Sequence, residues 1–193
     1  LAAQRNVHRT WSSNEKTAME EALGMSFAGK RALVCMKHVG LNVAADAFVN
    51  SAMTGANGGL VVVAADDPSM HSSQNEQDSR FYGKFALVPT FEPADQQEAY
   101  DMAKAAFDLS ERFRIPVLMR LTTRMAHSRA VVETGEARAE NPLSHPEQPR
   151  QWVLMPGNSR VRYQTLLEDY ARLEEESAAS PFNAYTEGPD KRL

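Results

Sequence analysis

Short apolar runs of strand length alternate along this chain with longer segments of helical periodicity. This alternation is typical of βαβ units, in which parallel strands form a sheet that carries helices on its faces. The sequence therefore predicts a doubly wound α/β fold with a mostly parallel sheet. The runs expected to form strands are rich in apolar residues, and they are NVHRTW (6–11), RALVCM (31–36), GLVVVAAD (59–66), FALVPTF (85–91) and IPVLMRLT (115–122).

Three helices are expected between these runs, over Ser13–Phe27, Leu41–Met53 and Asp95–Phe113. Asp95 and Glu98 have the spacing of a capping box at the start of the third helix. The periodicity fails from residue 129 to residue 158, where four prolines favour a linker, and a charged helix is expected over residues 159–178. We therefore predict a main domain over residues 1–130, followed by a linker, packing helix and tail over residues 131–193.

Composition excludes several classes of function. The net charge of -4, without a block of Lys or Arg, argues against binding to nucleic acid or to an anionic membrane surface. The apolar runs fall far short of the roughly 20 residues of a membrane-spanning helix, and no signal-peptide pattern is seen. A cytoplasmic protein that binds small molecules or other proteins is expected. The single cysteine, Cys35, is expected at a buried strand position.

Glu15 has two possible roles. Ser12, three residues before it, gives the pattern of a capping box, which is a structural role. On a helical wheel, however, Glu15 shares a sector with Met19, whereas Glu20 lies on the far side, where it can pair with Lys16. A carboxylate that faces an apolar stripe needs a partner or a raised pKa, and either would suit an acid that donates to a buried base. Glu15 is therefore a candidate for chemistry.

Polar residues are concentrated in ADDPSMHSSQNEQDSRFYG (65–83), directly after the run GLVVVAAD. Ligands of doubly wound sheets bind at the carboxyl ends of strands, where this segment should lie together with KHVGLN (37–42) and TTRMAHSR (122–129). The alternative is that these are ordinary polar surface loops. A hydrolase is not expected because there is no G-x-S-x-G elbow. Asp66, Asp67 and His71 match no strong ligand spacing, so no metal site is predicted.

Three segments together resemble the alpha subunit of indolepyruvate:ferredoxin oxidoreductases. They are WSSNEKTAMEEALGMSFAGKRALVCMKHVGLNVAADAF, GGLVVVAADDPSMHSSQNEQDSRFYGK and FEPADQQEAYDMAKAAFDLSERFRIPVLMRLTTRMAHS, and the string HSSQNEQDSR is the most specific part. Members of this family use thiamine diphosphate to convert aryl 2-oxo acids such as indolepyruvate to acyl-CoA by oxidative decarboxylation, with ferredoxin as the acceptor. The likeness is to the pyrimidine-binding domain, so it implies that residues 1–130 form such a domain.

The resemblance implies roles for individual residues. Glu15, in the step Asn14-Glu15, would hydrogen-bond the aminopyrimidine ring of the cofactor and act as the proton-relay residue. Gly40, Leu41 and Asn42 would line that ring.

On the substrate side, the resemblance implies His71, Gln77 and Arg80. Arg80 would hold the carboxylate of the 2-oxo acid, because a guanidinium can bind it through two parallel hydrogen bonds. The alternative is that Arg80 pairs with Asp78 or Glu76 and only orders the loop.

The chain also departs from the complete family pattern. It has neither a G-D-G motif followed by Asn nor a C-x-x-C, so Mg²⁺, the diphosphate and any iron–sulfur clusters would be held by parts not in this chain. We expect at most half a site, completed in an oligomer by a diphosphate-binding domain or subunit and by a ferredoxin-domain or beta subunit. Ferredoxin and coenzyme A would act through that full complex, and the chain alone is expected to be inactive. The alternatives are a non-catalytic assembly domain and a free-standing α/β binder of small ligands.

Overall fold

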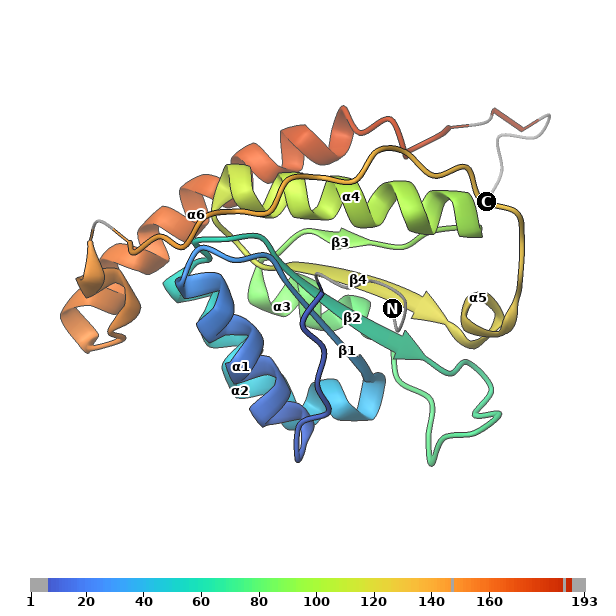
Figure 1. Cartoon of the computed structure of the whole chain (residues 1–193), viewed down its shortest axis with the longest axis horizontal. Helices are drawn as coiled ribbons and strands as arrows, with labels where there is room; N and C mark the ends of the chain where they lie inside the picture. The colour runs from blue at the N-terminus through green and yellow to red at the C-terminus, as the bar shows by residue number, and fades with distance from the viewer. Residues whose placement is uncertain (1–6, 147, 186, 189–193) are drawn as a thin grey trace.

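The structure is a computed structural model that describes residues 7–146, 148–185 and 187–188. Within these residues it has one four-stranded sheet, fully parallel, with the strand order β1-β2-β4-β3 (Figure 1). The strands are β1 (Ala32–Lys37), β2 (Leu60–Asp66), β3 (Thr90–Phe91) and β4 (Val117–Thr122). The predicted parallel α/β fold is thereby confirmed.

Helices cover both faces of the sheet (Figure 1). One face carries α1 (Glu15–Phe27) and α2 (His38–Thr54), and the other carries α4 (Gln96–Phe113). The remaining helical elements are α3 (Arg80–Ala86), α5 (Thr123–His127), η1 (Pro149–Trp152) and α6 (Pro156–Ala178). Because α2 begins at His38, the segment KHVGLN is the first turn of a helix and not the loop that the sequence suggested.

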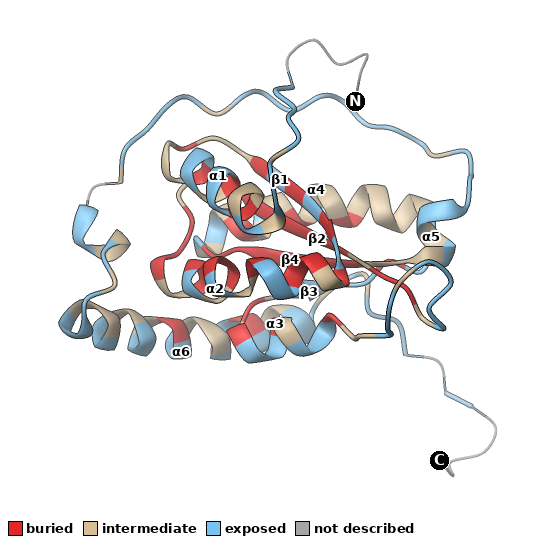
Figure 2. Ribbon diagram, turned by 90° about the horizontal axis from the view of Figure 1, so that it is seen from below, coloured by how far each residue is buried: buried red, intermediate tan, exposed pale blue. Residues whose placement is uncertain are grey.

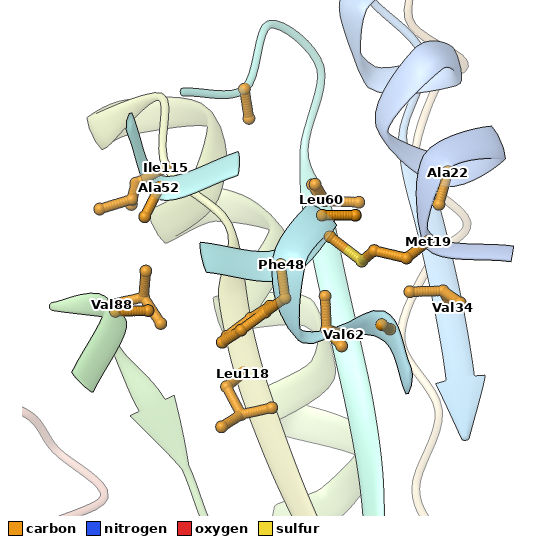
Figure 3. Close-up of a cluster of buried hydrophobic side chains, with 14 of the residues drawn as sticks. Met19, Ala22, Val34, Phe48, Ala52, Leu60, Val62, Val88, Ile115 and Leu118 are labelled. Atoms are coloured by element: carbon orange, nitrogen blue, oxygen red, sulfur yellow. The ribbon is translucent and has the colours of Figure 1, made fainter. Parts of the chain in front are cut away.

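Two apolar cores result from this layering. The core between the sheet and the pair α1 and α2 contains the fully buried side chains of Met19, Phe48 and Leu60 (Figure 3). The core on the α4 side comprises Val61, Val63, Met102, Ala106, Val117 and Met119. Figure 2 shows the buried residues gathered in the sheet and on the helix faces that turn toward it. β2 is buried on both faces, which explains its continuous apolar run.

One predicted strand does not form, and another is much shorter than expected. Residues 7–11 of NVHRTW form no strand, while Asn6 lies outside the described residues. In an extended strand Val7, Arg9 and Trp11 would share one face, so burying the two apolar residues would also bury the arginine. Val7 and Trp11 are both exposed. In FALVPTF only the last two residues pair with β4. Its first residues end α3, where Leu87 adopts a left-handed conformation with φ 59°.

Cys35 is exposed, so its predicted burial is wrong. β1 is an edge strand and its residues alternate between buried and exposed. Ala32, Val34 and Met36 face α1 and α2, whereas Leu33 and Cys35 lie on the opposite face. Since α4 packs against β2 and β4, the outer half of that face remains accessible.

The segment after α5 runs back along the molecule to α6. Residues 129–146, which we call the strap, pass along α4 (Figure 1), where Arg138 pairs with Asp108 at 2.5 Å. Leu166 and Leu173 of α6 are buried in the core of α1 and α2. A C-terminal helix after a proline-rich linker is thus confirmed, while the boundary at residue 130 stays a prediction. No helix in the described ranges is long and apolar enough to cross a membrane.

Candidate functional site

The first turns of α1 and α2 meet at the carboxyl edge of the sheet. A Cβ atom at Gly40 would lie 2.6 Å from Cγ and 2.9 Å from Oε1 of Glu15. The side chain of Glu15 therefore lies directly on the backbone of Gly40, in a contact that has no room for a Cβ atom unless one of the two residues moves. Two residues from separate parts of the predicted site are brought together here.

The capping of α1 differs from the prediction in a way that concerns Glu15. The cap is Asn14, whose side-chain oxygen accepts the N–H of Thr17 at 3.0 Å. Ser12 instead donates to the carboxylate of Glu21 at 2.6 Å. The predicted Ser12–Glu15 capping box is therefore wrong, because α1 begins at Glu15, two residues later than a cap at Ser12 requires. Glu15 is left without a role in helix capping.

Glu15 is partly buried, beside the fully buried Met19 of the same helix. Within the described part of the chain, its carboxylate has neither a hydrogen-bond donor nor an ion-pair partner. Its neighbour Glu20 is different, because it lies on the solvent side with Lys16 3.7 Å away, as predicted. A carboxylate that is half withdrawn from water and unpaired can still exchange a hydrogen bond with a ligand.

The other residues predicted to line the ring differ in accessibility. Leu41 is fully buried in the core, so its contact with a ligand would have to come from its backbone. Asn42 is exposed. Its side-chain Nδ2 donates to Oε1 of Gln77 at 2.8 Å, and its side-chain Oδ1 accepts a hydrogen bond from the hydroxyl of Tyr82. The structure therefore joins one predicted cofactor residue, Asn42, to one predicted substrate residue, Gln77.

His71 and Gln77 belong to residues 67–79, which we call the β2 loop. Asp67 shapes its beginning, since its carboxylate accepts the N–H groups of Ser72 at 2.7 Å and His71 at 3.1 Å, and the hydroxyl of Thr123 at 2.7 Å. The hydrogen bonds from Ser72 and Thr123, in that order of size, hold the pKa of Asp67 well below its usual range. The side chain of His71 itself is exposed at the surface.

Arg80 forms a two-pronged ion pair with Asp78. Its Nε lies 2.9 Å from Oδ1 and its Nη2 lies 2.7 Å from Oδ2, while Nη1 lies 3.6 Å from Glu92. The hydrogen bond from Arg80 is the main reason why the pKa of Asp78 is lowered. This geometry corresponds to the alternative in which Arg80 orders the loop, although Glu76, also considered for that pair, accepts the N–H of Ser69 instead.

A buried charge cluster beneath the β2 loop was missed in the sequence. Nε of Arg120 on β4 lies 2.5 Å from Oδ2 of Asp66 on β2, and both side chains are almost fully buried. Asp66 also accepts the N–H of Ser79 at 3.0 Å, and Arg120 reaches Glu92. The detectable signal was a single arginine inside the apolar run IPVLMRLT, because a buried charge requires a partner.

Comparisons with known proteins identify related sequences and a related fold. The profile of a family described as "Pyruvate flavodoxin/ferredoxin oxidoreductase, thiamine diP-bdg" matches residues 2–182. A protein of Archaeoglobus fulgidus named "Indolepyruvate oxidoreductase subunit IorA" is 47% identical over 191 residues, which are 97% of this chain and 30% of that protein. A protein of the same name from Pyrococcus abyssi is 46% identical over 196 residues, covering 98% of this chain and 30% of that protein. The chain thus spans about 30% of the length of these curated relatives.

A solved structure has a similar fold. It is a 2-oxoglutarate:ferredoxin oxidoreductase from Magnetococcus marinus with 2-oxoglutarate, coenzyme A and succinyl-CoA bound. The TM-score is 0.62 at 13% sequence identity, over 94% of this chain and 39% of that chain. At this level of identity the likeness establishes the fold.

Proposed function

Because the chain belongs to the thiamine diphosphate-binding family of the pyruvate flavodoxin/ferredoxin oxidoreductases, we propose that it is the pyrimidine-binding part of an enzyme that oxidatively decarboxylates aryl 2-oxo acids. The observation that carries the proposal is the contact between Glu15 and Gly40 at the carboxyl edge of the sheet. Indolepyruvate is the proposed substrate, since the relatives with 46–47% identity bear that name.

The residues at this edge suit an aminopyrimidine ring. Among the described residues, the carboxyl group of Glu15 has no hydrogen-bond or ion-pair partner. Gly40 has no Cβ atom that would cover this group on the side of α2. Glu15 would hydrogen-bond a ring nitrogen and move a proton to or from it, while Gly40 and Asn42 would flank the ring. Bound there, thiamine diphosphate supplies a carbon nucleophile for the 2-oxo group and an electron sink after the loss of CO₂.

The remaining parts of the enzyme would come from outside this chain. A diphosphate-binding domain or subunit would anchor the cofactor with Mg²⁺, and a ferredoxin-domain or beta subunit would carry iron–sulfur clusters. Ferredoxin and coenzyme A would meet the oligomeric assembly. The length of the relatives supports this proposal, because the matched part is 30% of each.

Glu15→Gln in the complete enzyme tests the proposal. The amide cannot exchange a proton with the ring, so deuterium exchange at the thiazolium carbon should slow by about a hundredfold or more. Glu20→Gln is the matched control, since Glu20 stands on the same helix but pairs with Lys16 on the solvent side. If exchange in the Glu15 variant equals exchange in the Glu20 variant, Glu15 is not the proton-relay residue.

A further inference from the structure

Three residues at the junction of β1 and α2 hold the β2 loop: Lys37 at the end of β1, and His38 and Asn42 at the start of α2. Nζ of Lys37 donates to the carbonyl oxygen of Ser72 at 2.8 Å. Nε2 of His38 lies 3.0 Å from the carbonyl oxygen of Asn75. Asn42 then donates to the side chain of Gln77 at 2.8 Å. The partners occur in the same order in both segments. Lys37, His38 and Asn42 contact Ser72, Asn75 and Gln77, respectively.

Among the described residues, these are the hydrogen bonds that join the middle of the loop to other elements. The two ends are fixed separately, by the bond of Asp67 to Thr123 at 2.7 Å and by the bond of Ser79 to Asp66 at 3.0 Å. Between those ends, residues 72–77 have no hydrogen bonds to described residues outside the loop except those to Lys37, His38 and Asn42. The position of that stretch therefore depends on α2.

His38 differs from the other two contacts in its burial. Its ring is 1% exposed, whereas Lys37 and Asn42 are exposed and their hydrogen bonds compete with water. Its second nitrogen, Nδ1, lies 3.3 Å from the carbonyl oxygen of Ala65 at the end of β2. Carbonyl oxygens only accept, and a neutral imidazole has one N–H, which serves the shorter contact at Nε2. Loss of the ring would leave the carbonyl oxygen of Asn75 without this donor, in a contact that is partly buried, and such a loss is costly.

His38 also stands two positions before Gly40, whose backbone supports Glu15. One helical turn thus contacts the proposed proton-relay residue on one side and the loop that carries His71 and Gln77 on the other. We propose that His38 is a positioning residue that fixes the β2 loop relative to Glu15, and so determines how the 2-oxo acid is held. The part of this inference that concerns substrate rests on the proposed function, whereas the part that concerns the loop does not.

The test uses three variants of the complete enzyme. His38→Leu keeps a similar volume but has no donor, whereas His38→Gln places an amide N–H near the position of Nε2. His145→Leu is the control, because His145 is an exposed histidine in the strap. Hydrogen exchange of the apoenzyme, followed by mass spectrometry, reports on the loop without any substrate or cofactor.

We expect His38→Leu to raise exchange in residues 68–77 about tenfold or more, since a buried hydrogen bond is lost. Exchange in β2 and α4 should stay near wild type, and His38→Gln should restore most of the protection. The KM for indolepyruvate should rise about tenfold in His38→Leu and recover in His38→Gln. The melting temperature of His38→Leu should fall a few degrees below the control, because a buried hydrogen bond is lost.

Three results would overturn the inference. Exchange in the loop could stay within twofold of the control, which would show that His38 does not hold it. Exchange could rise equally in the loop, β2 and α4, in which case His38 is an ordinary core residue. The loop could loosen without a change in KM, which would remove the role in substrate positioning. If the wild-type enzyme does not turn over indolepyruvate, the proposed substrate is wrong. The hydrogen-exchange data then test only whether His38 holds the β2 loop.

Discussion

Gly40→Ala is the substitution for which the structure allows the clearest forecast. The added Cβ would lie 2.6 Å from Cγ of Glu15, whereas ordinary contacts begin at 3.4 Å. Either Glu15 or the first turn of α2 must therefore move by about 0.8 Å, the difference between these two distances. Gly40 lies within a helix and has no positive φ, so alanine itself is favoured there by roughly 0.5–1 kcal/mol.

Stability and activity should therefore separate in this variant. The gain in helix propensity offsets much of the steric cost, and the melting temperature should stay within a few degrees of wild type. A displacement of about 1 Å in a group that moves a proton costs on the order of a hundredfold in rate. The kcat/KM of the complete enzyme at saturating cofactor should fall by that order.

Gly24→Ala provides the control, because Gly24 lies on the same helix as Glu15 and has nothing within 4 Å of an added Cβ. It should raise the melting temperature slightly and leave kcat/KM unchanged. Adding Gly40→Ala to Glu15→Gln should cost little further activity, since both act through one side chain. Equal kcat/KM in the two glycine variants, or full additivity with Glu15→Gln, would refute the reasoning.

Two further outcomes are expected. Arg80→Ala should leave the KM for the 2-oxo acid within about twofold and change the melting temperature little, because Arg80 is more than half exposed and already paired with Asp78. A tenfold rise in KM without a loss of stability would instead support its role as the carboxylate partner. Asp67 has a lowered pKa in the folded state, so its contribution to stability is present above the unfolded pKa of about 4 and is lost as the pH falls toward the folded pKa. The wild-type melting temperature should therefore fall more steeply between about pH 4 and pH 2 than that of Asp67→Asn, and parallel curves would contradict this.

The layered fold was predictable because its central strands are long, apolar and separated by periodic segments. β3 was not, since Pro89 and the left-handed Leu87 shorten its run to two paired residues. Glu15 was selected as a candidate functional residue from the direction of its side chain on the helical wheel. Its contact with Gly40, however, depends on how closely two helices approach, which no local pattern encodes.

The pairing of Arg120 with Asp66 could not be predicted for a related reason. It requires β2 and β4 to be neighbours in a particular register, in which Ala64 lies opposite Arg120. The order of strands in a sheet depends on crossover connections, and several orders are compatible with one alternating sequence. Two roles stayed open for Arg80, because the position of its loop was known from the sequence but the partner of its side chain was not.

The end of the sheet opposite Glu15 has a different character. There Arg31 binds Glu111 of α4 at 2.8 Å and the strap at the carbonyl of Ala139, while Ser110 accepts the N–H of Leu60 at 2.8 Å. These bonds fasten α4 and the strap to the amino ends of the strands. A ligand or subunit that contacts the carboxyl edge would therefore meet loops that are held by hydrogen bonds to α2 and its neighbours, whereas the amino ends of the strands are tied to α4 and the strap.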